Sequence, residues 1–169
     1  MSVLSTLTDA LASATVEVID LTAPLSSSTP VLKLPPPFSN TVSFALHEIS
    51  RFDDRGPAWY WNDITTGEHT GTHFDAPCHW VTGRDGEDVS QVAPGRLIAP
   101  AVMLDFSAQA AADPDFLLEV DHILAFERAN GALPAGGWLL IRTGWDARSG
   151  DQEAFLNGGA TPGVSIACA

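Results

Sequence analysis

EHTGTHFDAPCHW, residues 68–80, contains three of the five histidines in the chain together with an aspartate. His69, His73, Asp75 and His79 all occupy odd positions, and residues of one parity share a face of an extended strand. The threonines, the glycine and the proline of this stretch disfavour a helix. The sequence therefore predicts a strand that runs into a bent loop and brings the four side chains together.

The spacing of the first two histidines requires a bend. Residues four positions apart on a straight strand are separated by roughly 13 Å, which is long for two imidazoles that each bind one ion at about 2.1 Å. Gly71 lies midway between His69 and His73, where a missing Cβ permits a kink. Imidazole and carboxylate ligands suit Zn or Mn. A divalent metal ion, Zn or Mn, is therefore the expected cofactor.

Two interpretations of the histidines compete. A single histidine on a strand is more often a structural residue than a ligand, whereas the set of four side chains favours metal binding. His79 stands beyond Pro77, which ends regular strand pairing and can turn the chain back toward the metal. His79 is then either a further ligand or a proton shuttle.

The run from His69 to His79 has the pattern His-x-Gly-Thr-His-x-Asp-x-Pro-x-His. This pattern resembles the signature of the metal-dependent cyclase family, which includes proteins of the kynurenine formamidase and isatin hydrolase type. Residues 19–22, 29–31 and 140–145 are also similar to pieces of that family. The resemblance therefore covers most of the chain.

The resemblance implies a fold, an activity and roles for the motif residues. The fold would be a swivelling β/β/α domain, and the protein would be a homodimer. His69, His73 and Asp75 would be metal ligands, and His79 would be the proton donor and acceptor. Family members hydrolyse linear or cyclic amides.

The chain departs from the family pattern in two places. Formamidases of the family carry a substrate-contacting tryptophan just after the Thr-Pro-Val piece, where this chain has Leu32. The family also supplies a further metal-ligand histidine and a glutamate from a region that should follow residues 162–165, and this sequence stops at Ala169. We therefore expect a single cyclase-like domain, residues 1–169, that is incomplete at the C-terminus.

Composition and charge exclude several classes of function. Hydrophobic residues make up 45% of the 169 residues, which is typical of one globular domain. Eight basic and 21 acidic residues give a formal charge of −13, so phosphate backbones and anionic membranes would repel the chain. We expect a small-molecule amide as partner, and neither nucleic acid nor membrane. Two cysteines and the lack of a basic leader indicate a cytoplasmic protein.

The remaining sequence predicts a mixed α/β fold, with a mixed sheet and flanking helices. Runs of apolar or alternating apolar and polar residues predict strands, and apolar residues at helical spacing predict helices. The prolines and serines between residues 22 and 40 predict an irregular arm. The expected strands cover residues 16–21, 41–49, 58–64, 97–104 and 138–142. The expected helices cover residues 1–14, 113–130 and 151–157.

Aromatic residues near the motif are candidates for substrate binding. Trp59 and Trp61 share one face of their strand and precede the motif, so they could form the wall of a pocket for a flat substrate. Tryptophans in such positions are more often part of a core or an interface. Phe74, inside the motif, completes the predicted substrate-binding set.

These observations favour a metal-dependent hydrolase that uses metal-activated water to cleave amide bonds of the aryl formamide or the cyclic amide and imide type. One alternative is a truncated, catalytically silent metal-binding module of the same family. Another is a surface-binding domain without metal. Metal content combined with an amidase assay separates the three.

Overall fold

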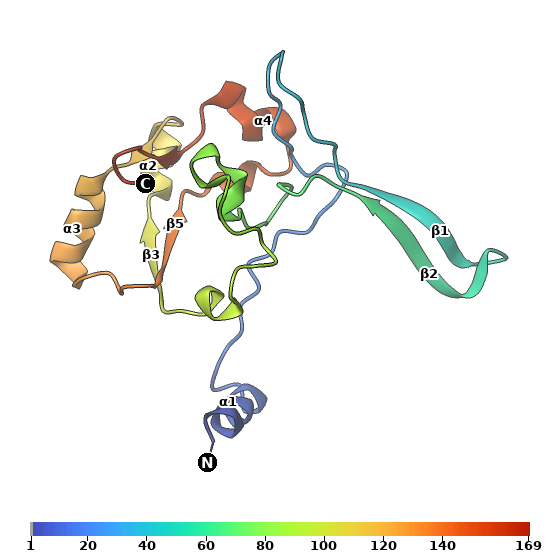
Figure 1. Ribbon diagram of the computed structural model, residues 1–169, viewed down its shortest axis with the longest axis horizontal. Coiled ribbons are helices and arrows are strands. Elements are labelled where there is room, and N and C mark those ends of the chain that lie inside the picture. The colour runs from blue at the N-terminus through green and yellow to red at the C-terminus, as the bar shows by residue number, and fades with distance from the viewer. Residues whose placement is uncertain (1) are drawn as a thin grey trace.

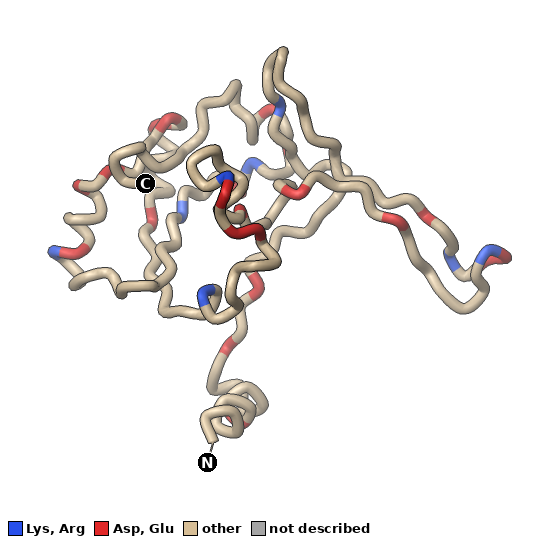
Figure 2. The backbone as a smooth tube through the Cα atoms, viewed as in Figure 1, with Lys and Arg blue, Asp and Glu red and all other residues tan. Residues whose placement is uncertain are grey.

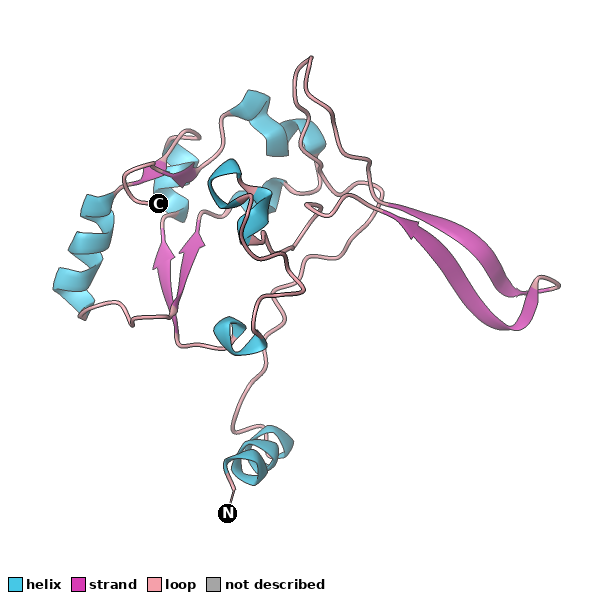
Figure 3. Ribbon diagram, viewed as in Figure 1, coloured by secondary structure: helices cyan, strands magenta, loops and turns pink. Residues whose placement is uncertain are grey.

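The computed structural model describes residues 2–169, and it confirms the mixed α/β class (Figures 1 and 3). The strands lie in three separate two-stranded sheets, one antiparallel and two parallel. Helix α1 (Val3–Ala12) confirms the predicted N-terminal helix, and it begins at Ser2, whose side chain accepts a hydrogen bond from the Ser5 N–H. Within residues 2–169, no helix is long and apolar enough to cross a membrane.

Strands β1 (Ala45–Asp53) and β2 (Gly56–Thr65) form an antiparallel hairpin that projects away from the rest of the chain (Figure 1). Both predicted strands in this region are confirmed, although β1 begins later and continues almost to the turn. Charges of both signs gather at the tip (Figure 2), where Arg55 contacts Glu48 at 2.7 Å and also pairs with Asp53. These exposed ion pairs lower the pKa of Glu48 and of Asp53 below their ordinary values.

Strands β3 (Ala101–Asp105) and β5 (Trp138–Arg142) confirm the two predicted apolar strands and pair in parallel, although Leu104 is their one buried residue. The core lies around them and consists of Leu104, Phe106 and Leu118. Partly buried residues of helix α3 (Val120–Asn130) pack against this core. At the carboxyl end of β3, hydrogen bonds from Ser107 and then Arg142 hold the pKa of Asp105 below its ordinary value.

Apart from α3, the remaining elements are short. They comprise α2 (Ser107–Ala112), β4 (Leu117–Leu118), α3 (Val120–Asn130), α4 (Gln152–Leu156) and β6 (Gly163–Val164), together with the 3₁₀ helices η1 (Pro77–His79), η2 (Val81–Gly83), η3 (Pro94–Leu97), η4 (Trp145–Arg148) and η5 (Asn157–Gly159). Strands β4 and β6 pair in parallel. Helix α4 confirms the predicted helix that begins after Asp151, whose carboxylate accepts hydrogen bonds from Glu153 and Ala154.

Outside the histidine motif, the predictions for residues 16–21 and 113–130 differ most from the structure. Residues 16–21 form no strand, because none of the described residues pairs with them, and Val18 and Ile19 are 77% and 68% exposed. The helix predicted over residues 113–130 begins only at Val120. Glu119 caps its N-terminus, and the two residues before Glu119 form strand β4 instead of helix. Its end is as predicted, at Gly131 with φ +94°.

Residues 13–44 run over the surface without helix or strand, which confirms the predicted irregular arm at residues 22–40. The segment from Ala23 to Leu32 passes beside the histidine motif and beside η4 and α4 (Figure 1). We call residues 23–32 the arm segment. It brings the beginning of the chain into contact with residues more than one hundred positions later.

Candidate metal centre

Asp75 is the point on which the histidines of the motif converge. Its Oδ1 lies 2.6 Å from His69 Nδ1 and 3.2 Å from His73 Nε2. The three side chains are between 31% and 37% exposed, so the group is open to solvent. Two imidazoles thus point at the same carboxylate oxygen, which is the convergence that the sequence predicts.

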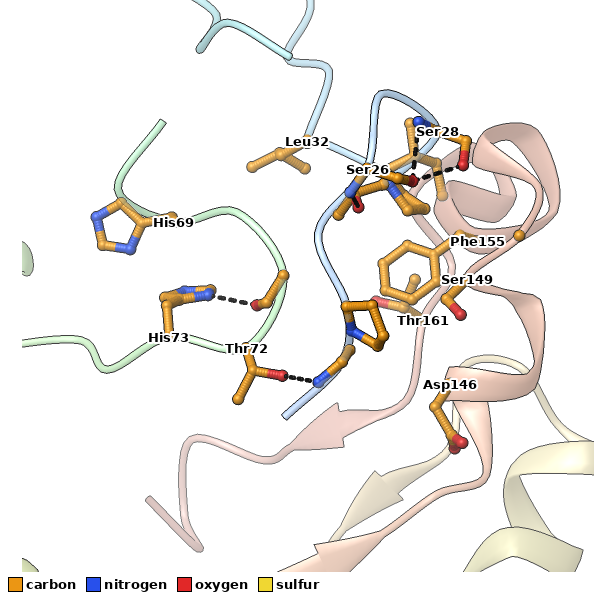
Figure 4. A pocket seen from close by; sticks show the side chains of 17 residues that line it. Ser26, Ser28, Leu32, His69, Thr72, His73, Asp146, Ser149, Phe155 and Thr161 are labelled. Carbon is orange, nitrogen blue, oxygen red and sulfur yellow. Dashed lines mark hydrogen bonds between the residues drawn. The ribbon is translucent and has the colours of Figure 1, made fainter. Parts of the chain in front are cut away.

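A backbone carbonyl group orients the ring of His73. His73 Nδ1 lies 2.7 Å from the Gly71 carbonyl oxygen (Figure 4). Because a carbonyl only accepts, Nδ1 carries a hydrogen, and Nε2 is the ring nitrogen that faces Asp75. Such a hydrogen bond is the usual support of a metal-binding histidine. The Nε2 atom and the carboxylate oxygen lie 3.2 Å apart, a spacing that two ligands of one ion can have, so the residues fit a divalent metal ion.

His79 completes the cluster from η1, the short helix that begins at Pro77. Its ring centroid lies 3.9 Å from that of His69. Ligand atoms of His69, Asp75 and His79 all lie within 4.8 Å of one another. The structure therefore brings all four predicted residues together. The most closely spaced three include His79 in place of His73, so the choice between ligand and proton shuttle for His79 stays a prediction.

The motif bends at the predicted residue, although it does so without a strand. Residues 66–76 form turns and loops, and Gly71 has φ +65°, a left-handed conformation that favours glycine. The expectation of a strand was wrong because no described segment pairs with these residues. The loop still converges because the turn at Gly71 reverses the chain between His69 and His73.

Replacing Gly71 by alanine is expected to lower the free energy of unfolding by about 1–2 kcal/mol, because a Cβ is strained at this φ. The added Cβ would also lie 2.5 Å from Leu25 Cδ2, which must move aside. Urea denaturation measures the change. Gly95→Ala is the control, because its Cβ meets no atom within 4 Å. Equal stability of the two variants would show that the turn at Gly71 needs no glycine.

A cavity of about 520 Å³ lies beside His69 and His73 (Figure 4). One wall is the arm segment, another is the motif loop, and the third comes from residues 146–161. Apolar side chains of Leu32, Phe155 and Leu156 line much of it, with serine and threonine hydroxyl groups between them. A cavity of this size and lining can hold a small, flat organic molecule next to the histidines.

The sequence profile of the Cyclase family matches residues 19–169. This chain belongs to the Cyclase family. It is 49% identical over 163 residues to the isatin hydrolase of Roseibium aggregatum, an alignment that covers 95% of this chain and 62% of the relative. The chain thus spans less than two thirds of that relative's length.

Solved structures of Cyclase relatives have the same fold. Isatin hydrolase A from Ralstonia solanacearum superimposes with a TM-score of 0.94 at 48% identity, over 99% of this chain and 66% of that protein. An isatin hydrolase bound to the product analogue thioisatinate superimposes with a TM-score of 0.92 at 46% identity, over 98% of this chain and 67% of that protein. These matches confirm the cyclase-like fold expected from the motif.

The aromatic residues predicted to bind substrate lie in different places in this Cyclase chain. Phe74 lines a second, smaller cavity of about 220 Å³, together with Asp75, Trp80 and Trp138. Trp59 and Trp61 lie on the projecting hairpin and line neither of these two cavities. Their role in substrate binding stays a prediction.

Sequence reasoning missed the wall of the large cavity that comes from residues 146–161. Phe155 and Ser149 belong to this wall, and neither stands near a recognisable motif (Figure 4). One signal was present, because strand β5 ends just before Thr143 and ends of such strands often line sites in α/β proteins. That signal indicates a region and no particular side chain.

Proposed function

We propose that this Cyclase family chain contributes to a hydrolase that opens a cyclic aryl amide of the isatin type. Water is added across the ring C–N bond, which gives a carboxylate and an aryl amine. The observation that carries the proposal is the group of three imidazoles around Asp75, of which His69 and His73 line a largely apolar cavity. The relatives' names support the substrate class.

The large cavity favours a flat aromatic substrate. Leu32, Phe155 and Leu156 offer apolar surface to a ring, while the histidines lie at one end. Leu32 stands where formamidases of the family have tryptophan, so a cyclic amide is the first candidate and an aryl formamide the second. The volume of about 520 Å³ lies within the usual range for small-molecule sites.

The metal is proposed to be Zn or Mn, held by His69, His73 and Asp75. Bound there, such an ion would polarise a carbonyl oxygen and lower the pKa of a water ligand toward about 7. The Gly71 carbonyl orients His73 for this role through its Nδ1–H. His79 would accept a proton from the attacking water and pass it to the leaving nitrogen, because imidazole exchanges protons near neutral pH.

The test is an assay of purified protein loaded with Mn or Zn, in which loss of isatin is followed by absorbance and metal is measured by mass spectrometry. Turnover that stops with a chelator and returns with metal supports the proposal. Bound metal without turnover of isatin or an aryl formamide would favour the silent metal-binding module. A metal-free protein that is indifferent to chelators would contradict both.

We also propose that the chain forms a homo-oligomer through the hairpin. The described residues expose 12605 Å², whereas a compact monomer of this length exposes about 8,000 Å². On the hairpin, Leu46 and Ile64 face each other across the strands and are 53% and 64% exposed. A two-stranded hairpin is marginal in water, and a stable dimer buries roughly 1,200–2,000 Å². A second copy would cover this apolar surface.

The double substitution Leu46→Ser and Ile64→Ser is expected to convert the oligomer to a monomer, because it removes the paired apolar side chains of the hairpin. Light scattering coupled to size-exclusion chromatography measures the mass. The control is Ile98→Ser with Ile166→Ser, which changes two apolar side chains elsewhere that are 82% and 99% exposed. A wild-type chain that is monomeric, or a double variant of unchanged mass, would contradict the proposal.

The proposed compartment is the cytoplasm. Cys78 and Cys168 are both free thiols, as expected where thiols are kept reduced. The formal charge of −13 supports a small molecule as partner, with neither nucleic acid nor an anionic membrane bound.

A further inference from the structure

The arm segment is attached to α4 by one side chain that makes two hydrogen bonds. Gln152 Nε2 donates to the Val31 carbonyl oxygen at 2.9 Å, and Gln152 Oε1 accepts from the Val31 N–H at 3.4 Å. Val31 is 2% exposed, among the most buried side chains of the described chain. A primary amide is the uncharged side-chain group that can donate and accept at once in this geometry. Gln152 therefore satisfies both backbone groups of a buried residue.

The other end of the arm segment is attached to the histidine motif. The Ala23 N–H donates to Thr72 Oγ1 at 2.9 Å (Figure 4), and Leu25 lies against the backbone at Gly71. Between the two attachments the chain makes a turn of its own, in which the Ser26 N–H donates to Thr29 Oγ1 at 2.9 Å. The segment is therefore a preformed piece that is held at its two ends.

Most of the arm segment lines the large cavity. Ala23, Pro24, Ser26, Ser28, Thr29, Pro30 and Leu32 all belong to its wall. Phe155, three residues after Gln152, lies in the wall that adjoins the arm (Figure 4). A change in how Gln152 holds Val31 therefore alters the shape of the cavity without touching His69, His73 or Asp75.

We propose that Gln152 is a positioning residue that fixes the arm segment and thereby sets how tightly the cavity binds substrate. The proposal rests on the proposed function, because it takes the large cavity as the substrate site. Loss of the two hydrogen bonds frees the arm at Val31, so the binding surface must be ordered each time a substrate binds. Proton transfer at the motif is unchanged, so KM responds and kcat does not.

The experiment compares Gln152→Ala with Gln109→Ala, the same change at an exposed position of α2. In Gln152→Ala, KM for isatin is expected to rise about fivefold to tenfold with kcat changed less than about twofold. Amide hydrogen exchange at residues 29–32 is expected to accelerate about tenfold or more. Gln109→Ala should change neither quantity.

Gln152→Glu tests the donor separately. The carboxylate cannot donate to the Val31 carbonyl and places a charge beside it, so KM is expected to be at least as high as in Gln152→Ala. Unchanged exchange at residues 29–32 in Gln152→Ala would overturn the proposal, as would a fall in kcat at constant KM or a wild-type KM in Gln152→Glu. If the wild-type chain does not hydrolyse isatin, the proposed function fails, while exchange at residues 29–32 still decides whether Gln152 holds the arm.

Discussion

Asp75→Ala is expected to remove the bound metal and, with it, the hydrolase activity. Asp75 Oδ1 is the one atom that both His69 Nδ1 and His73 Nε2 approach, at 2.6 and 3.2 Å. Without the carboxylate the imidazoles lose the anion that favours a cation between them. Metal affinity should weaken by more than about 100-fold. Mutation of residues that only support the ligands already lowers metal affinity by about 10–100-fold, and loss of a ligand should lower it further. Mass spectrometry after dialysis against metal-free buffer measures the loss.

The control for this prediction is Asp85→Ala, which removes an aspartate whose side chain is 94% exposed and whose contact with Arg84 is loose, at 3.7 Å. It should retain both metal and activity. Circular dichroism shows whether Asp75→Ala is still folded. A folded Asp75→Ala protein with a full complement of metal would show that Asp75 is no ligand and that the cluster is a hydrogen-bonded group.

His79→Ala is expected to keep its metal and lose about 10²–10⁴-fold in kcat, the range for removal of a general acid–base group. His69, His73 and Asp75 remain to hold the ion. The ring of His79 lies close enough to the cluster, 3.9 Å from that of His69, to exchange protons with a molecule bound there. Steady-state rates and metal content are measured on the same preparation.

His47→Ala is the matched control, because His47 lies on the hairpin and contacts Thr65 at 2.9 Å. It should resemble the wild type in rate and in metal content. If His79→Ala loses as much metal as Asp75→Ala, His79 is a ligand, as its place in the most closely spaced group suggests. Unchanged kcat would instead remove His79 from the mechanism.

The sequence predicted the residues of the candidate site better than the elements that carry them. His69, His73, Asp75 and His79 converge as expected, because Gly71, a residue within the motif itself, permits the bend. Strands β3 and β5 were also predictable as strands, since a short, continuous apolar run favours a strand.

Other features could not be predicted because they depend on distant partners. Residues 16–21 alternate like a strand, yet a strand exists only where another strand pairs with it, and none of the described residues does so. Neither Val31 nor Gln152 has an unusual sequence context, and their contact joins positions 121 residues apart. The cavity that Phe155 lines also takes its walls from residues far apart in the sequence, so no local pattern could indicate it.

The bond between Val31 and Gln152 also determines when the cavity can appear during biosynthesis. The chain leaves the ribosome N-terminus first, and domains fold in that order, so residues 23–32 emerge long before the residues that hold them. Until α4 has been made, the proline-rich stretch has no anchor at Val31 and the cavity lacks one side. Contacts so distant in sequence also slow folding. The nascent chain can therefore gather its histidines early, but it gains a shaped binding surface only after α4 has emerged.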